Sequence, residues 1–106
     1  MRGPDVAFVR HERVPNPLPP AFARFAPDLA IEVLSPNDRP GEILSKVGDW
    51  LSAGTRLVWV VDPTRHMARV YRADGSDDVV GADGTLNGEA VLPGFAVHLS
   101  TILPQP

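Results

Sequence analysis

Runs of hydrophobic residues divide the chain into short segments, and three of these runs predict strands. Residues 28–34 and 57–61 are apolar at almost every position, a pattern typical of strands covered on both faces. Residues 5–9 form a shorter run that predicts a third strand before them. The core of the domain is therefore expected to be a β-sheet.

A helix is predicted between the two buried strands. Apolar side chains recur there at the spacing of one helical face, at Ile43, Val47, Trp50 and Leu51. The pattern predicts a helix over residues 42–53 that ends at Gly54. A strand–helix–strand unit of this kind implies a right-handed parallel crossover.

Proline and glycine residues predict loops and turns in the rest of the chain. Residues 10–27 are rich in proline and predict an extended connector, with a brief turn of helix at 21–25. Beyond the second buried strand, residues 68–72 and a hairpin turn at Asp74-Gly75 predict a β-meander. It continues in short strands or bends at residues 79–80, 86, 91–92 and 95–99.

These elements predict a single α/β domain over residues 1–106, with a mixed central sheet and one main crossover helix. One helix covers only one face of a sheet, so the other face is expected to lack cover and the chain to be incomplete or oligomeric. We expect a homodimer, because soluble proteins pair or cover exposed edges and apolar patches. Val6 and Phe8 are the candidate contacts, since they point away from Asp5.

Composition narrows the class of protein. A chain of 106 residues, 43% hydrophobic and 22% charged, fits one small globular domain. No apolar run approaches the ~18–20 residues that cross a bilayer, so no membrane partner is expected. The absence of cysteine excludes disulfides, a thiolate nucleophile and cysteine-bound zinc, and it is compatible with a cytoplasmic location. The net charge of -3 lacks the basic excess of many nucleic-acid binders.

Two carboxylates are candidates for a metal site. Glu32 lies among apolar neighbours within a buried strand, where an ionised carboxylate is costly unless it is paired or binds a cation. The strand period places Glu32 on one face with the small Ala30, and Asp5 likewise shares a face with Ala7. If the two strands are neighbours, both carboxylates can hold Mg²⁺ or Mn²⁺. The alternatives are an ion pair of Glu32 with Arg39 or Arg56, and a turn role for Asp5.

Lys46 is the only lysine of the chain and borders the apolar stripe of the predicted helix. From there its stem can lie along the sheet and bring the ammonium group toward Glu32. Two acids and a lysine suit metal-dependent phosphodiester cleavage, in which the lysine stabilises developing charge. The alternative is a pair with Glu42 on a solvated helix face.

The segments that carry these residues resemble a known family. GPDVAFV at residues 3–9, PDLAIEVLSP at 27–36, Lys46 and LVWVVDP at 57–63 resemble, in order, the putative restriction endonuclease family of the PD-(D/E)XK nuclease superfamily. The resemblance extends over nearly the whole chain. It implies that Asp5 is the first acidic position and Glu32 the second. The superfamily lysine would fall at Leu34, and in this family Lys46 of the following helix takes its place.

The resemblance implies a restriction-endonuclease-like core and metal-dependent cleavage of DNA, with Asp5, Glu32 and Lys46 as catalytic residues. Family members are longer and begin with a helix and strands before the first acid, so this chain is expected to lack them. Two other functions remain open: a catalytically silent remnant that acts as an oligomerisation or binding module, and a small acidic interaction protein.

Overall fold

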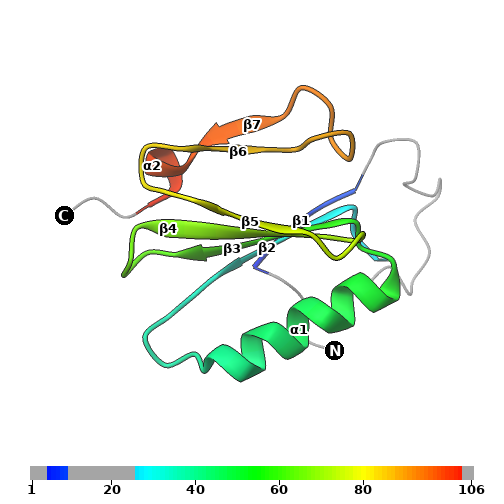
Figure 1. Cartoon of the computed structure of the whole chain (residues 1–106), viewed down its shortest axis with the longest axis horizontal. Helices are drawn as coiled ribbons and strands as arrows, with labels where there is room; N and C mark the ends of the chain where they lie inside the picture. Colours follow the sequence, from blue (N-terminus) through cyan, green and yellow to red (C-terminus); the bar gives the residue numbers. More distant parts are fainter. Residues whose placement is uncertain (1–4, 10–25, 104–106) are drawn as a thin grey trace.

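The computed structural model describes residues 5–9 and 26–103, and Figure 1 shows their arrangement. The elements in chain order are β1 (Val6–Phe8), β2 (Leu29–Val33), α1 (Pro40–Ala53), β3 (Leu57–Asp62), β4 (Met67–Arg72), β5 (Asp77–Val80), β6 (Thr85–Asn87), β7 (Ala96–His98) and α2 (Leu99–Ile102).

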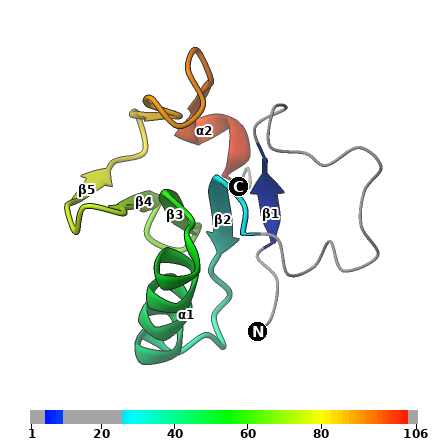
Figure 2. The same cartoon turned by 90° about the vertical axis from the view of Figure 1, so that its right-hand side faces the viewer.

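The predicted mixed sheet and its crossover are confirmed. Five strands lie in the order β1-β2-β3-β4-β5. β2 and β3 are parallel and joined through α1, whereas the other neighbouring pairs are antiparallel. In Figure 2, α1 covers one face of the sheet and α2 lies on the other side.

Helix α1 begins two residues earlier than its apolar stripe predicts. It starts at Pro40, which is tolerated in the first turn because the amide there needs no helical partner. Ile43, Val47 and Trp50 form its buried face. The helix ends at Gly54, whose φ of 114° is left-handed and suits glycine, as predicted.

The two faces of the sheet bury separate cores. Under α1, small and branched residues of the sheet (Ala30, Val58 and Val60) meet the helix stripe. On the opposite face, larger side chains such as Leu29 and Trp59 pack against Leu86 and Leu99 from β6 and α2. Both faces of the central strands are therefore apolar, which explains why β2 and β3 read as continuous hydrophobic runs.

The expectation that one sheet face lacks cover was wrong. A second layer, the β6–β7 hairpin and α2, lies on that face, as Figure 1 shows. Leu99 was expected in a short strand or bend and instead begins α2. The residues at 91–92, also expected in a strand or bend, lie in the turn between β6 and β7. Strands of three residues carry too little alternation to show whether they extend one sheet or form another.

Because β6, β7 and α2 cover the second face of the sheet, a bare apolar face no longer supports the expected homodimer. Phe8 packs within the chain against Phe95, with ring centroids 5.1 Å apart, so part of its surface is already covered. Val6 is 43% exposed on the end strand β1. The homodimer stays a prediction that rests on β1 being the end strand of the described sheet. Residues 10–25, which hold most of the predicted connector and all of its helical turn, lie outside the described residues.

Within the described residues, no helix has both the length and the apolar character needed to cross a membrane.

Candidate active site

Glu32 lies on the face of β2 that packs under α1, as the strand period predicts. Its side chain is only 8% exposed. Its neighbour across the parallel pair is Val60 of β3, and Ala30 on the same face belongs to the α1 core. A carboxylate in such apolar surroundings needs a cationic partner or a bound cation, because desolvation disfavours its charged form.

Lys46 of α1 supplies one partner. Its Nζ donates a hydrogen bond of 2.9 Å to Oε1 of Glu32. Lys46 therefore reaches Glu32, as expected from its position on the helix. Glu32 pairs with Lys46 and not with Arg39 or Arg56, the two alternatives. The crossover makes this contact possible, since it places one edge of the helix stripe directly over the strand that precedes it.

The second oxygen of Glu32 is left without a partner. Oε2 is buried and has no hydrogen-bond partner among the described residues. A buried carboxylate oxygen without a donor is unfavourable by about 1–3 kcal/mol or more. Such an atom marks a position at which a bound cation or water would be stabilising.

Asp5 lies beside Glu32 at the end of β1. The β1–β2 register pairs Val6 with Ile31, and one further step along it places Asp5 opposite Glu32. Oδ2 of Asp5 accepts a hydrogen bond of 2.7 Å from the backbone N–H of Val33. The structure thus brings together the three residues expected at the site, with Asp5 exposed and Glu32 buried.

The two acids have the donor chemistry for a hard divalent cation. Magnesium is commonly held by one or two carboxylates, with water and substrate phosphate completing its oxygen ligands. The unpartnered Oε2 of Glu32 and the exposed carboxylate of Asp5 suit this role. Among the residues that the structure describes, no group of three or more histidine, aspartate or glutamate side chains forms a fuller metal cage.

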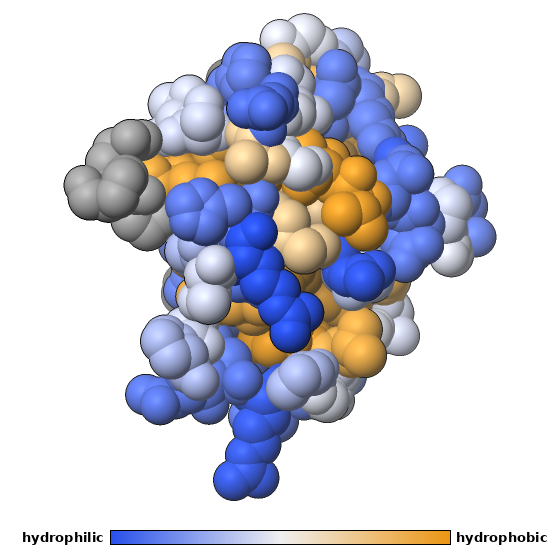
Figure 3. Space-filling view, turned by 60° about the vertical axis from the view of Figure 1, so that its left-hand side comes forward, coloured by the Kyte–Doolittle hydropathy of each residue, from blue (hydrophilic) through white to orange (hydrophobic). Residues whose placement is uncertain are grey.

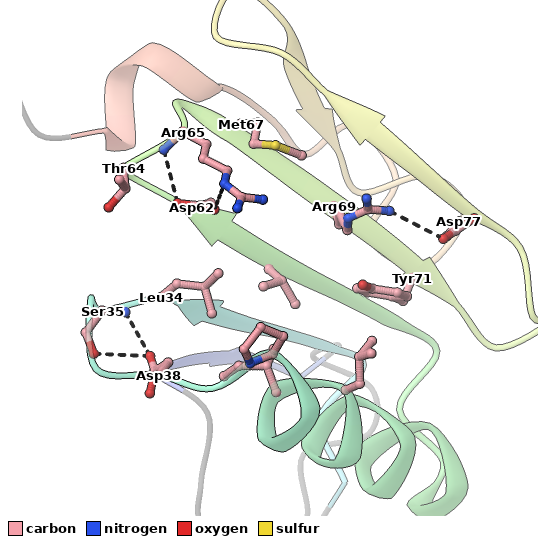
Figure 4. A pocket seen from close by; sticks show the side chains of 14 residues that line it. Leu34, Ser35, Asp38, Asp62, Thr64, Arg65, Met67, Arg69, Tyr71 and Asp77 are labelled. Atoms are coloured by element: carbon pink, nitrogen blue, oxygen red, sulfur yellow. Dashed lines mark hydrogen bonds and ion pairs between the residues drawn. The ribbon is translucent and has the colours of Figure 1, made fainter.

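A pocket of about 620 Å³ is lined by neighbours of the Glu32–Lys46 pair and not by the two residues themselves. Its wall includes Val60, the cross-strand neighbour of Glu32, and Ile43, which lies one helical turn before Lys46. Leu34, two residues after Glu32, also lines it. Figure 4 shows the pocket open between the first turns of α1 and strands β3 and β4.

Arg69 and Tyr71 of β4 also line this pocket, and the sequence analysis missed them. Both point to the α1 side of the sheet, whereas Ala68 and Val70, which alternate with them along β4, are buried in the opposite core. The alternation along β4 is the signal that could have found them, because Arg69 and Tyr71 fall on the strand face opposite the apolar Ala68 and Val70.

Comparison with known proteins agrees with this geometry. A solved structure with similar fold is a putative nuclease belonging to DUF820 from Anabaena variabilis ATCC 29413, with a TM-score of 0.63 and 25% sequence identity. The match covers 71% of this chain and 42% of that protein, so the chain spans less than half of the neighbour's length. No protein with a curated description matches the chain. The model of the Uma2 family, described as putative restriction endonucleases, matches residues 1–101, and the chain belongs to this family.

Proposed function

We propose that the protein is a metal-dependent endonuclease that hydrolyses DNA phosphodiester bonds at the Asp5–Glu32–Lys46 site. The observation that carries the proposal is the state of the Glu32 carboxylate. It is buried, Lys46 holds one of its oxygens, and the other oxygen has no partner in the described structure. Membership of a family of putative restriction endonucleases and the nuclease-like fold support the same conclusion.

Asp5 and Glu32 would hold Mg²⁺ or Mn²⁺ from two adjacent strands. When bound, the cation polarises the phosphate and makes a water molecule more acidic. The pairing of the two strands sets the spacing of the carboxylates, so the site is held by backbone hydrogen bonds as well as by side chains.

Lys46 would supply positive charge to the phosphate as negative charge develops on it. Its ammonium group is compact and its side chain is 23% exposed, so it can reach a substrate without leaving the neighbourhood of Glu32. The apolar stripe of α1 fixes the backbone beneath it. The lysine therefore acts from a rigid element, which favours preorganised charge.

A catalytically silent binding module is the second candidate. The surroundings of Asp5 favour it, because its Oδ2 is occupied by the backbone N–H of Val33 and the described residues contain no group of three or more histidine, aspartate or glutamate side chains that could hold a metal. Such a module would bind DNA in a salt-dependent manner without any requirement for metal.

Manganese-dependent stability tests the metal site. A cation that binds only the folded state raises the melting temperature by mass action. We expect millimolar Mn²⁺ to raise it in the wild type and to have no effect in Glu32→Ala. Arg56→Gln changes an exposed cation outside the site and should keep the shift. An equal shift in Glu32→Ala would overturn the assignment of the metal ligands.

Cleavage of plasmid DNA tests the role of Lys46. Lys46→Met keeps the apolar stem and should abolish nicking while the chain stays folded, and Lys46→Arg should restore it only in part, because a planar guanidinium does not replace a compact ammonium. Nicking that persists in Lys46→Met would contradict a catalytic lysine. Metal-independent binding without any cleavage in the wild type would favour the silent module.

A further inference from the structure

The pocket beside the Glu32–Lys46 pair has the size and lining of a ligand site. Its volume of about 620 Å³ falls within the usual range for small organic ligands. One part of its wall is aliphatic, with Leu34, Ile43 and Val60 near the ion pair. Figure 3 shows apolar surface between hydrophilic side chains at the end of the molecule where the β2–α1 loop and the β3–β4 turn lie.

The same wall includes one aromatic ring. Tyr71 of β4 is half-buried and lies at one end of the pocket, as Figure 4 shows. Aromatic rings that line a groove are the usual partners of unstacked nucleic-acid bases, because every base has a flat π-face. A paired base inside a duplex cannot present that face to a side chain.

Charged groups of both signs line the pocket, namely Arg65 and Arg69 together with Asp38, Asp62 and Asp77. Arg69 lies in the same cross-strand row as Glu32, since Val60 pairs with both residues. The backbones of Glu32 and Arg69 are two strand spacings, or about 10 Å, apart. The side chain of Arg69 is 50% exposed, and its contact with Asp77 is 3.9 Å long, which leaves its donors available to a phosphate. Arg65 stands at the other end with a similarly long contact to Asp62.

We propose that this pocket receives one unpaired nucleotide of the substrate strand, next to the phosphate that is cleaved. Its base lies against Tyr71 and the aliphatic wall, and its phosphate lies near Arg69. The proposal rests on the proposed function for the position of the scissile phosphate. It implies that single-stranded or locally unpaired DNA is preferred over a perfect duplex, because the duplex must first release a base at a cost of a few kcal/mol.

Binding in the absence of metal tests the pocket separately from cleavage. The probe is a short oligonucleotide with one 2-aminopurine, offered in EDTA as a single strand, as a duplex with a mismatch at that base and as a perfect duplex. We expect tighter binding of the unpaired forms, together with quenching of 2-aminopurine by stacking. Tyr71→Leu should weaken binding of the unpaired forms about tenfold or more and remove the quenching.

Two matched variants separate the pocket from general effects. Tyr71→Phe keeps the ring and should bind as the wild type does. Arg69→Gln should weaken binding and lower its salt dependence, whereas Arg56→Gln, at an exposed position outside the pocket, should change neither. Melting curves confirm that the variants are folded.

Equal affinity for single strand and duplex, or unchanged binding in Tyr71→Leu, would overturn the pocket proposal. Neither result affects metal-dependent nicking that is lost in Lys46→Met. Conversely, selective binding through Tyr71 without any nicking would support the pocket while the proposed cleavage fails. A ribose oligonucleotide of the same sequence, run in parallel, shows whether the strand must be DNA.

Discussion

The two faces of the sheet are built from the same strands but differ in chemistry. The face toward β6–β7 buries large apolar side chains and is closed by a hairpin and a short helix. The face toward α1 has a smaller core and carries Glu32, Lys46, Arg69 and Tyr71. Alternation along each strand separates these sets, so a single residue step decides whether a side chain contributes to the closed core or to the candidate site.

The larger core and the candidate site therefore lie on opposite faces of the same sheet. The closed face can be packed for stability because it contributes no group to the candidate site. Each face holds a buried polar atom without a partner in the described structure, but on the closed face it is the neutral Nε1 of Trp59, whereas on the α1 face it is a carboxylate oxygen of Glu32, which is more costly to bury. Substitutions on the two faces are therefore expected to have opposite signatures, which the following variants test.

The largest loss of stability is expected on the closed face. Trp59 is fully buried and stacks on Phe95, with ring centroids 5.9 Å apart and planes 5° from parallel. Trp59→Ala should lower the free energy of unfolding by about 3–5 kcal/mol, because it leaves a cavity between the layers. Urea unfolding measures this loss. Tyr71→Leu on the other face is the control and should cost less than about 1.5 kcal/mol; equal losses would remove the contrast between the faces.

A smaller loss is expected when the ion pair under α1 is broken. Lys46→Met leaves the buried Glu32 carboxylate without its cation and should cost about 2 kcal/mol, reduced from a fully buried pair by the exposure of the lysine. Adding Glu32→Leu should recover most of this loss, because an apolar pair at the two positions leaves no buried charge without a partner. Asp49→Asn on the exposed side of the same helix should stay within about 0.5 kcal/mol. A double variant no more stable than Lys46→Met would show that packing, not charge, is responsible.

A still smaller loss of stability is expected when the ion pairs of Arg72, which attach the second layer to β4, are weakened. Arg72 of β4 donates from Nε to both carboxylate oxygens of Glu89, at 3.0 and 2.9 Å, and from Nη2 to Asp78 at 2.7 Å. These carboxylates raise the pKa of Arg72, so it stays charged at any ordinary pH. Arg72→Lys should cost about 1 kcal/mol, because a lysine cannot reproduce the fork. Amide exchange should quicken in β6 and β7 and stay unchanged in β2; uniform acceleration would contradict a local attachment.

The smallest effect is expected at the exposed turn before β5. The Ser76 hydroxyl, together with the Ser76 backbone N–H, lowers the pKa of Asp74 below its ordinary value of 3.8. A lowered carboxyl pKa contributes stability that is present above 3.8 and is lost as the pH falls through the lower, folded value. Asp74→Asn should therefore show a slightly smaller loss of urea midpoint between neutral pH and about pH 3 than the wild type. Identical acid profiles would mean that the turn carries no stability.

Sequence patterns predicted the central part of the fold because its signals are local. The helix stripe and the two apolar strands identified the crossover, and the crossover in turn placed Lys46 over Glu32. The second layer was not predictable, since β6 and β7 have three residues each and their packing depends on contacts with distant strands.

The candidate site was also predicted unevenly. The convergence of Asp5 and Glu32 was conditional on β1 and β2 being neighbours, which no local pattern reveals. The bond from Asp5 to the Val33 amide depends on the register of two strands that lie far apart in the chain. Arg69 and Tyr71 become candidate site residues only because they line the pocket, which forms where α1 packs against the sheet.

The place of β1 at the end of the sheet has a dynamic consequence. This strand has three residues and pairs within the described sheet only with β2, so it is expected to open locally more often than the interior strands. Each opening would carry Asp5 away from Glu32 and leave the Lys46 pair in place. A cation that needs both carboxylates would then bind only the closed fraction of molecules, and its apparent affinity would fall by that fraction. By the same linkage, the bound cation would act as a clamp that slows amide exchange along the edge strand.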